Sequence, residues 1–205
     1  LLEALRLDLG KPTFEAWTAD IGFGISEIDH SVAHLRSWMK PRRVRTPLTF
    51  KPGTSKLVPE PLGVVTVIAP WNYPVQLALQ PLAAAVAAGN AVVAVASERW
   101  PLLATDLYPV LETSDVPAGA LNLITGGRSA LAAVLADHDD VALLWCGAVG
   151  VAAAGAHGAL MADLEARAAG NLKATWSVDL ADPPPVAEWL RRSTQVKNVW
   201  LPYGV

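Results

Sequence analysis

Residues 64–98 read VVTVIAPWNYPVQLALQPLAAAVAAGNAVVAVASE and contain one complete β-α-β repeat. The runs from Val64 to Ala69 and from Ala91 to Ala96 are short, almost entirely apolar and rich in valine, which is typical of strands buried on both faces. The stretch from about Val75 to Ala88 has the composition of a buried helix, and PWNYP marks the turn before it. This alternation predicts a parallel sheet covered by helices.

The same alternation continues toward the C-terminus. Further strand-like runs lie at Ala120 to Thr125 and Val141 to Trp145, and helical stretches lie at about Pro101 to Glu112, Arg128 to Ala136 and Val149 to Ala169. Because connections between parallel strands are right-handed, the pattern predicts a doubly wound, Rossmann-like α/β domain over residues 61–182.

The segment before this domain predicts a helical arm over residues 12–39. Apolar side chains recur there in steps of three and four, at Phe14, Trp17, Ile21, Ile25, Ile28, Val32, Leu35 and Trp38. Pro12 begins the helix and Pro41 ends it. Gly22 and Gly24 each weaken it by about 1 kcal/mol relative to alanine, so the arm needs a neighbour to pack on.

Two extended segments, TPLTF and SKLVPE, flank KPGT and predict a hairpin, which completes an N-terminal region of residues 1–60. The basic run KPRRVR at residues 40–45 is either a nuclear-targeting or anion-binding patch or a solvated helix end, and we interpret it as a helix end. At the other terminus, DPPPVAEWLRRSTQ predicts a short helix and QVKNVWLPYG a half-exposed strand, both within residues 183–205.

The composition excludes several classes of protein. The chain has 205 residues, of which 52% are hydrophobic and 17% charged, and this balance favours a packed globular protein over a disordered one. A net charge of -3 gives no support for nucleic-acid binding, and the apolar runs do not predict a membrane span. Because a single cysteine forms no internal disulfide, we expect a cytoplasmic protein.

Several ordered motifs resemble the NAD(P)-dependent aldehyde dehydrogenase superfamily. Residues 60–93 resemble the opening of its cofactor domain, DVPAGALNLITGG its next strand and turn, and STQVKNVW its C-terminal oligomerisation strand. The segments DLGKPTFEAW and IGFGISEIDHSVAHLRSWMKPRRVRTPLTFKPG are similar to its fatty-aldehyde branch, and ATDLYPVLETSDVPAG is similar to the degenerate second module of two-module members.

The resemblance implies a set of cofactor-binding positions, of which only some keep the family residue. Asn72 matches the oxyanion asparagine, and it is alternatively a cap for the helix after Pro74. The cleft positions that the resemblance implies are Ile68, Pro70, Trp71, Asn72, Val95, Ser97, Glu98, Gly147 and Ala148. Glu98 is kept, but Val95 replaces a lysine that holds the adenosine ribose, and Ala148 lacks the hydroxyl of the family serine. We therefore expect NAD or NADP to bind weakly or not at all.

The catalytic groups of the family are missing. Ser177 occupies the general-base position, and Asp179, on the same face of a strand, is a weak substitute. The domain that carries the nucleophilic cysteine is absent, and we interpret Cys146 as a buried, unreactive residue rather than a low-pKa thiol at a helix start. His30 and His34 are more typical of a surface pair than of a metal site, and GGRS at Gly126 to Ser129 is a weak phosphate-loop signal.

These observations predict a truncated, catalytically silent family member that acts by assembly, as a homodimer or as a heteromer with a full-length relative. Two alternatives remain. The chain is part of an enzyme completed by a partner with the nucleophile, or it binds a nucleotide without turnover.

Overall fold

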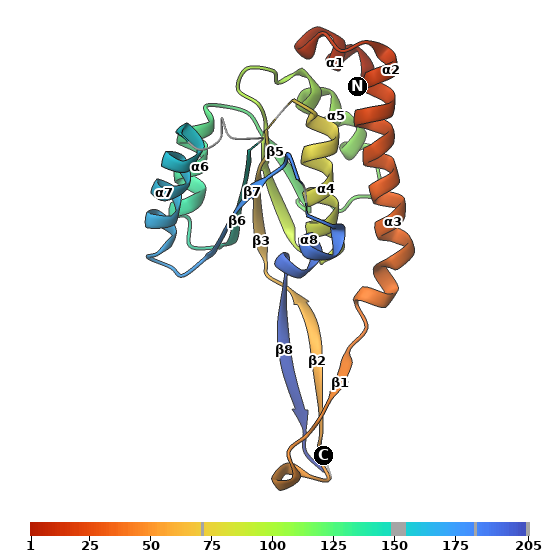
Figure 1. Ribbon diagram of the computed structural model, residues 1–205, viewed down its shortest axis with the longest axis vertical. Coiled ribbons are helices and arrows are strands. Elements are labelled where there is room, and N and C mark those ends of the chain that lie inside the picture. Colours follow the sequence, from red (N-terminus) through yellow and green to blue (C-terminus); the bar gives the residue numbers. More distant parts are fainter. Residues whose placement is uncertain (71, 149–154, 183, 204–205) are drawn as a thin grey trace.

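A five-stranded parallel sheet forms the body of the computed structural model, which describes residues 1–70, 72–148, 155–182 and 184–203 (Figure 1). Its strands, in spatial order, are β5 (Leu121–Ile124), β4 (Ala91–Val95), β3 (Val64–Ile68), β6 (Val141–Ala148) and β7 (Ala174–Asp179). The chain builds the sheet outward from β3 in one direction and then returns to β6 on its other side. This is the doubly wound order predicted from the sequence, so the α/β fold class is confirmed.

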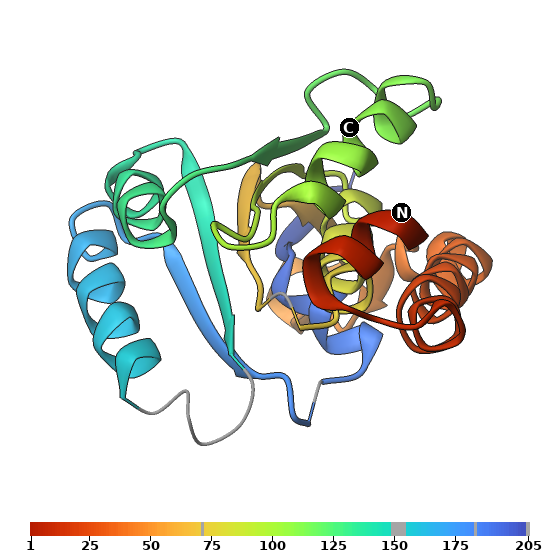
Figure 2. The ribbon, with the colours of Figure 1, turned by 90° about the horizontal axis from the view of Figure 1, so that it is seen from above.

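Helices cover both faces of this sheet (Figure 2). On one face lie α4 (Pro74–Ala87) and α8 (Val186–Arg192), and on the other lie α6 (Arg128–Asp137) and α7 (Ala156–Ala168). The two sides have separate apolar cores, one containing Trp145 and Trp189 and the other Cys146 and Leu164. The first part of the helix predicted over residues 149–169 lies outside the described residues.

The N-terminal arm follows the predicted range. After α1 (Leu2–Leu9), helical structure runs through α2 (Thr13–Glu15), a π-helical turn (Ala16–Ile21) and α3 (Gly22–Trp38), and α1 lies beside α5 (Leu102–Glu112). Within the described ranges, no helix is both long and apolar enough to cross a bilayer.

The prediction of the buried face of the arm holds only in part, because Ile21 is buried and Leu35 and Trp38 are half-buried, whereas the other five apolar positions are exposed. Phe14, Trp17 and Val32 are 80%, 52% and 69% exposed, whereas the buried positions of α3 are the small or polar Gly24 and Ser31. A Cβ atom on Gly24 would come within 3.2 Å of a side-chain methyl group of α4, so the helices approach too closely for large residues. Close approach, rather than hydrophobicity, selects this face.

A buried ion pair within the N-terminal segment includes the carboxylate that bonds the arm to the body. Lys11 Nζ lies 3.0 Å from Asp20 Oδ2, and the two side chains are 7% and 0% exposed. The other oxygen of Asp20 accepts a hydrogen bond from the backbone N–H of Gln76 at 2.8 Å, in the first turn of α4. Asp20 therefore caps α4 from a different element. The interpretation of Asn72 as its cap was wrong, because Tyr73 occupies the N-cap position and no N-cap side chain bonds the helix.

A second, antiparallel sheet projects from one end of the body. It has the order β1 (Arg42–Val44), β2 (Thr54–Pro61) and β8 (Thr194–Leu201), so the predicted hairpin exists and the C-terminal strand joins it. Its first strand differs from the prediction, because TPLTF contains a 3₁₀ turn (Leu48–Phe50) and the basic run supplies β1. Three residues of that run pair with Ser55 to Leu57, so they form an edge strand and not a helix end.

The side chain of Asn90 joins the projecting sheet to the body. Its oxygen accepts hydrogen bonds from the N–H groups of Leu62 (2.7 Å) and Gly63 (3.0 Å), where β2 leads into β3. Its nitrogen donates to the carbonyl oxygens of Ala85 (2.9 Å) and Ser193 (2.8 Å). Because the residue is 3% exposed, all four bonds are shielded from water.

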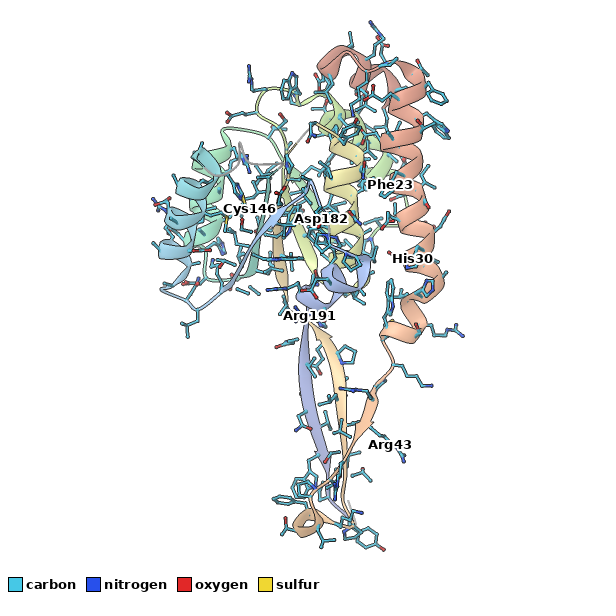
Figure 3. The ribbon with its side chains drawn as sticks, in the orientation of Figure 1. Phe23, His30, Arg43, Cys146, Asp182 and Arg191 are labelled. Carbon is cyan, nitrogen blue, oxygen red and sulfur yellow. The ribbon has the colours of Figure 1, made fainter. Side chains whose placement is uncertain are left out.

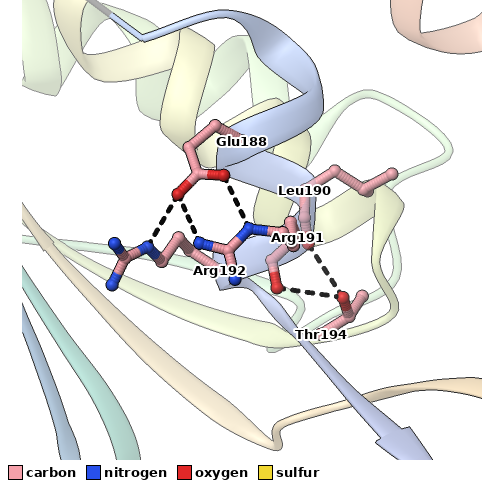
Figure 4. Close-up of polar contacts among 5 residues, drawn as sticks. All are labelled: Glu188, Leu190, Arg191, Arg192 and Thr194. Carbon is pink, nitrogen blue, oxygen red and sulfur yellow. Dashed lines mark hydrogen bonds and ion pairs between the residues drawn. The ribbon is translucent and has the colours of Figure 1, made fainter.

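The turn from α8 into β8 is held by contacts within a few residues (Figure 4). The Glu188 carboxylate accepts hydrogen bonds from Arg191 and Arg192, which lower the pKa of Glu188 to about 2. Thr194 Oγ1 donates to the carbonyl oxygens of Leu190 (3.0 Å) and Arg191 (3.2 Å). These bonds set the direction in which β8 leaves the body.

Candidate functional site

A hollow of about 330 Å³ lies at the carboxyl ends of β3 and β4, beside the point where the strand order reverses. Doubly wound sheets bind ligands at this position. Its lining consists of Ala69, Pro70, Asn72, Val95, Ala96, Ser97, Glu98, Arg99, Trp100 and Arg128.

The structure brings most of the predicted cleft residues together. Pro70, Asn72, Val95, Ser97 and Glu98 all line the hollow, and the Asn72 side chain is exposed there. The remaining predicted positions behave differently: Ile68 is fully buried in the core beneath, Gly147 and Ala148 end β6 outside the lining, and Trp71 lies outside the described residues.

Polar groups in the hollow already bond to the protein. Glu98 Oε2 accepts a hydrogen bond from the N–H of Arg128 at 2.7 Å, at the start of α6. Ser97 Oγ accepts from the N–H groups of Arg99 (3.3 Å) and Trp100 (3.1 Å). These bonds order the loop after β4, but they occupy acceptors that a ribose would otherwise use.

The cations that line the hollow are Arg99 and Arg128, and neither stands at the position of the family lysine. Val95 is 2% exposed and belongs to the core beneath the hollow, so no cation stands at the family lysine position. The hollow lies where a doubly wound sheet binds a nucleotide. Of the two residues expected to contact the ribose, it has only the carboxylate of Glu98.

A polar cluster lies next to the hollow, at the carboxyl ends of β6 and β7. Cys146 and Ser177 are opposite one another in the parallel register, and His157 of α7 lies over both. His157 Nε2 is 3.0 Å from Ser177 Oγ, and His157 Nδ1 is 3.9 Å from Cys146 Sγ. Arg128 donates to the Cys146 sulfur (3.4 Å) and to the carbonyl oxygen of Gly147 (3.2 Å).

Burial dominates the electrostatics of this cluster. It raises the pKa of the fully buried Cys146 thiol, against the smaller opposing effect of Arg128, so the thiol is protonated at neutral pH. Burial, together with the positive charge of Arg128, lowers the pKa of His157 below its ordinary value. Figure 3 shows Cys146 within the body. This geometry agrees with the interpretation of Cys146 as an unreactive core residue.

His157 and the contacts of Arg128 were missed in the sequence. The only signal was that both residues lie near the starts of helices that follow strands, and that position places a side chain at the binding edge of such a sheet. Asp179 lies further along the same edge, and its Oδ1 accepts a hydrogen bond from the N–H of Ala181 at 2.9 Å.

The histidine pair on the arm carries no sign of a metal site. The rings of His30 and His34 stack with centroids 4.1 Å apart on exposed positions of α3. Among the described residues, no group of three or more His, Cys, Asp or Glu side chains is placed to hold a metal ion.

Comparison with known proteins identifies relatives. A model described as "Aldehyde dehydrogenase family" matches residues 1–163. An aldehyde dehydrogenase from Craterostigma plantagineum is 40% identical over 140 residues, covering 68% of this chain and 29% of that protein. The substrate-bound structure of Staphylococcus aureus AldH superposes with a TM-score of 0.72 at 31% identity, covering 87% of this chain and 36% of that one.

A variant of P. syringae indole-3-acetaldehyde dehydrogenase, determined in complex with NAD+ and IAA, superposes with a TM-score of 0.74 at 28% identity. The alignment covers 87% of this chain and 34% of that one. The chain thus spans roughly a third of the length of these relatives.

Proposed function

The chain belongs to the aldehyde dehydrogenase family, and from this premise we propose that it is a catalytically silent member that acts by assembling with other chains. The observation that carries the proposal is the projecting sheet. None of the residues in β1, β2 and β8 is buried, so both faces of this sheet are open to solvent. A three-stranded sheet without a covered face is marginally stable, and a partner chain that covers one face would stabilise it.

The strand register separates an apolar face from a charged face. Residues opposite each other across antiparallel strands share a face. The apolar face carries Val44, Leu57, Pro59, Val196 and Trp200, with Arg42 as its one charged residue, and the charged face carries Arg43, Lys56, Glu60 and Lys197 among Val58, Val199 and Leu201. The charged face of each copy has three cations and one carboxylate. Two copies that met through this face would bring like charges together, so we assign the contact to the apolar face.

The far end of the sheet is shaped around Trp200. Its ring meets the Phe50 ring edge-on with centroids 5.6 Å apart, and the indole remains 50% exposed. A Cβ atom on Gly53 would lie 2.8 Å from the indole nitrogen, so only glycine fits beside this ring. Tryptophans that are fixed by their neighbours and remain partly exposed are often the residues that contribute most of the binding free energy at protein interfaces.

We predict that the chain forms a homodimer, or a heteromer with a full-length relative, and that deletion of residues 195–205 releases monomer or aggregate. The change Trp200→Asp should raise the dissociation constant at least about 30-fold, which corresponds to about 2 kcal/mol. Sedimentation velocity at a series of concentrations measures this shift.

The matched control is Val199→Asp, which places the same charge on the charged face of the same strand. It should leave assembly unchanged. A stable, soluble monomer at tens of micromolar, unaffected by the deletion, would remove the assembly proposal.

We also predict that the chain alone does not oxidise medium-chain aldehydes with NAD or NADP. The family reaction requires a thiolate that attacks the aldehyde, and the only cysteine of this chain is fully buried with a raised pKa. NADH formation should equal the buffer rate. Turnover that disappeared in Cys146→Ala would contradict this prediction.

Cofactor binding is predicted to be weak. Two missing hydrogen bonds of about 0.5 to 1.5 kcal/mol each, or up to about 3 where a charged donor is lost, weaken binding by about ten- to a thousand-fold. Val95→Lys and Ala148→Ser, which restore the family residues, should each tighten NAD binding in calorimetry, whereas Val134→Lys on the exposed surface of α6 should not. Low-micromolar affinity in the unchanged chain would overturn the prediction.

A second candidate function rests on the hollow. Asn72 is exposed there beside Glu98, an arrangement that suits a working part of an enzyme completed by a partner with the nucleophile. Mixing the chain with a cysteine-bearing relative tests this function. Aldehyde oxidation above that of the relative alone, lost in Asn72→Ala, would favour it over the silent assembly role.

A further inference from the structure

Ser177 and His157 have the geometry of a nucleophile and its general base. The 3.0 Å contact joins the serine hydroxyl oxygen to His157 Nε2, within the range in which an imidazole removes a hydroxyl proton. Ser177 is exposed at the edge of the parallel sheet, and His157 is held in the first turn of the 13-residue helix α7. Neither residue has a role in the assembly proposed above. Ser177 stands at the general-base position of the family, and the silence proposed above concerns aldehyde oxidation, whereas the reaction inferred here is a different one.

The other imidazole nitrogen is oriented by the core. His157 Nδ1 faces Cys146 Sγ at 3.9 Å, and Arg128 fixes that sulfur with a 3.4 Å contact. If Nδ1 carries the proton, it points at the sulfur and leaves Nε2 free to accept the Ser177 proton. The neighbouring guanidinium opposes a positive charge on the ring and so favours this neutral, basic form.

The surroundings of Ser177 admit a small molecule. An open hollow of about 650 Å³ lies beside β7. Its lining consists of Trp176, Ser177, Val178, Pro184 and Pro185 together with the charged residues Asp179, Asp182, Glu188 and Arg192. The N-cap residue of α7 is Gly155, which has no side chain that could cap the helix. The first N–H groups of an α-helix have no acceptors within the helix. Amides of that kind stabilise a developing oxyanion.

The geometry points to Ser177 as an acyl-accepting nucleophile, with His157 as its base, for small carboxylic esters that have a good leaving group. Ser177 Oγ forms a bond to the carbonyl carbon while its proton passes to His157 Nε2. The bond from the carbonyl carbon to the leaving oxygen then breaks, and the leaving group takes the proton from Nε2. Water, deprotonated by His157, cleaves the new serine ester and releases the carboxylic acid.

The test uses an alkyl fluorophosphonate, which forms a stable oxygen–phosphorus bond with an activated serine and loses fluoride. We expect mass spectrometry of the intact chain and its peptides to place a single adduct on Ser177. Hydrolysis of p-nitrophenyl acetate should be lost in Ser177→Ala and fall about 100-fold in His157→Gln. Ser129→Ala and His30→Gln, at exposed positions on other helices, serve as matched controls and should keep the full rate.

A pH profile separates a base from a structural partner. His157 is faced by Cys146, by Ser177 and by the cation of Arg128, with Asp179 further along β7, and its pKa is lowered from 6.5. The rate of labelling should therefore hold from neutral pH down to about pH 6.5 and fall only below it, as the ring gains a proton. An adduct on another residue, the absence of any adduct, or an unchanged rate in Ser177→Ala would each overturn the inference.

Discussion

Replacing Asn90 with alanine is expected to lower the free energy of unfolding by about 4 kcal/mol, because four buried hydrogen bonds of about 1 kcal/mol each are lost. The substitution leaves the N–H groups of Leu62 and Gly63 and the carbonyl oxygens of Ala85 and Ser193 without their partner. A loss of this size is a large share of the stability of a typical domain. Urea denaturation followed by far-UV circular dichroism measures it.

A control for this prediction is available in β5, the strand that pairs with β4. Asn122→Ala also removes two hydrogen bonds to carbonyl oxygens, those of Val92 (3.2 Å) and Gly119 (2.8 Å), but at a solvent-exposed side chain where water replaces them. Its effect should be within about 1 kcal/mol. Equal effects of the two substitutions would show that Asn90 is not the joint between the body and the projecting sheet.

Replacing Asp20 with alanine is expected to destabilise the fold by about 3–5 kcal/mol, because it leaves the Lys11 ammonium buried without a counter-ion. The same change removes the cap from α4, where Gln76 N–H loses its acceptor. Lys11 also lies 3.5 Å above the centre of the Tyr73 ring, a contact too weak to replace a carboxylate. Denaturant titration of the single variant measures the loss.

The double variant Lys11→Met, Asp20→Ala tests the cause. Removing both charges should recover part of the stability lost in Asp20→Ala. Arg6→Ala breaks an exposed ion pair with Glu3 on α1 and should leave the unfolding midpoint unchanged. A double variant no more stable than Asp20→Ala would assign the loss to the cap rather than to the unpaired lysine.

The parallel sheet can be predicted from local sequence because its central strands are apolar on both faces. The residues of β3 and β4 form short apolar runs rich in valine, which is typical of strands in the middle of a parallel sheet. The edge strands are harder to predict, since β7 is mostly exposed or half-buried and two of the three residues of β1 are arginines. Their pairing partners lie elsewhere in the chain, and a local pattern does not contain them.

The face of the arm illustrates a different limit. Its apolar residues predict burial, yet Trp17 and Val32 are exposed, while Gly24 and Ser31 lie against α4. Helix packing depends on how near two backbones come, and that distance is a tertiary property. By contrast, Asn72 and Glu98 line one hollow, as expected, because both belong to one β-α-β repeat.

The pairing of β2 with β8 has a consequence for how the chain folds during synthesis. Gln195 bonds to Pro61 from 134 positions away, so the middle strand of the projecting sheet is made long before its main partner. At typical elongation rates this delay is on the order of 10 seconds. Throughout it, β2 has only the three-residue β1 to pair with, and its Leu57 and Val58 present an open edge to other nascent chains. The native pairing is a late event between strands that are far apart in the sequence, and the ribosome-bound chain is exposed to mispairing until β8 has been made.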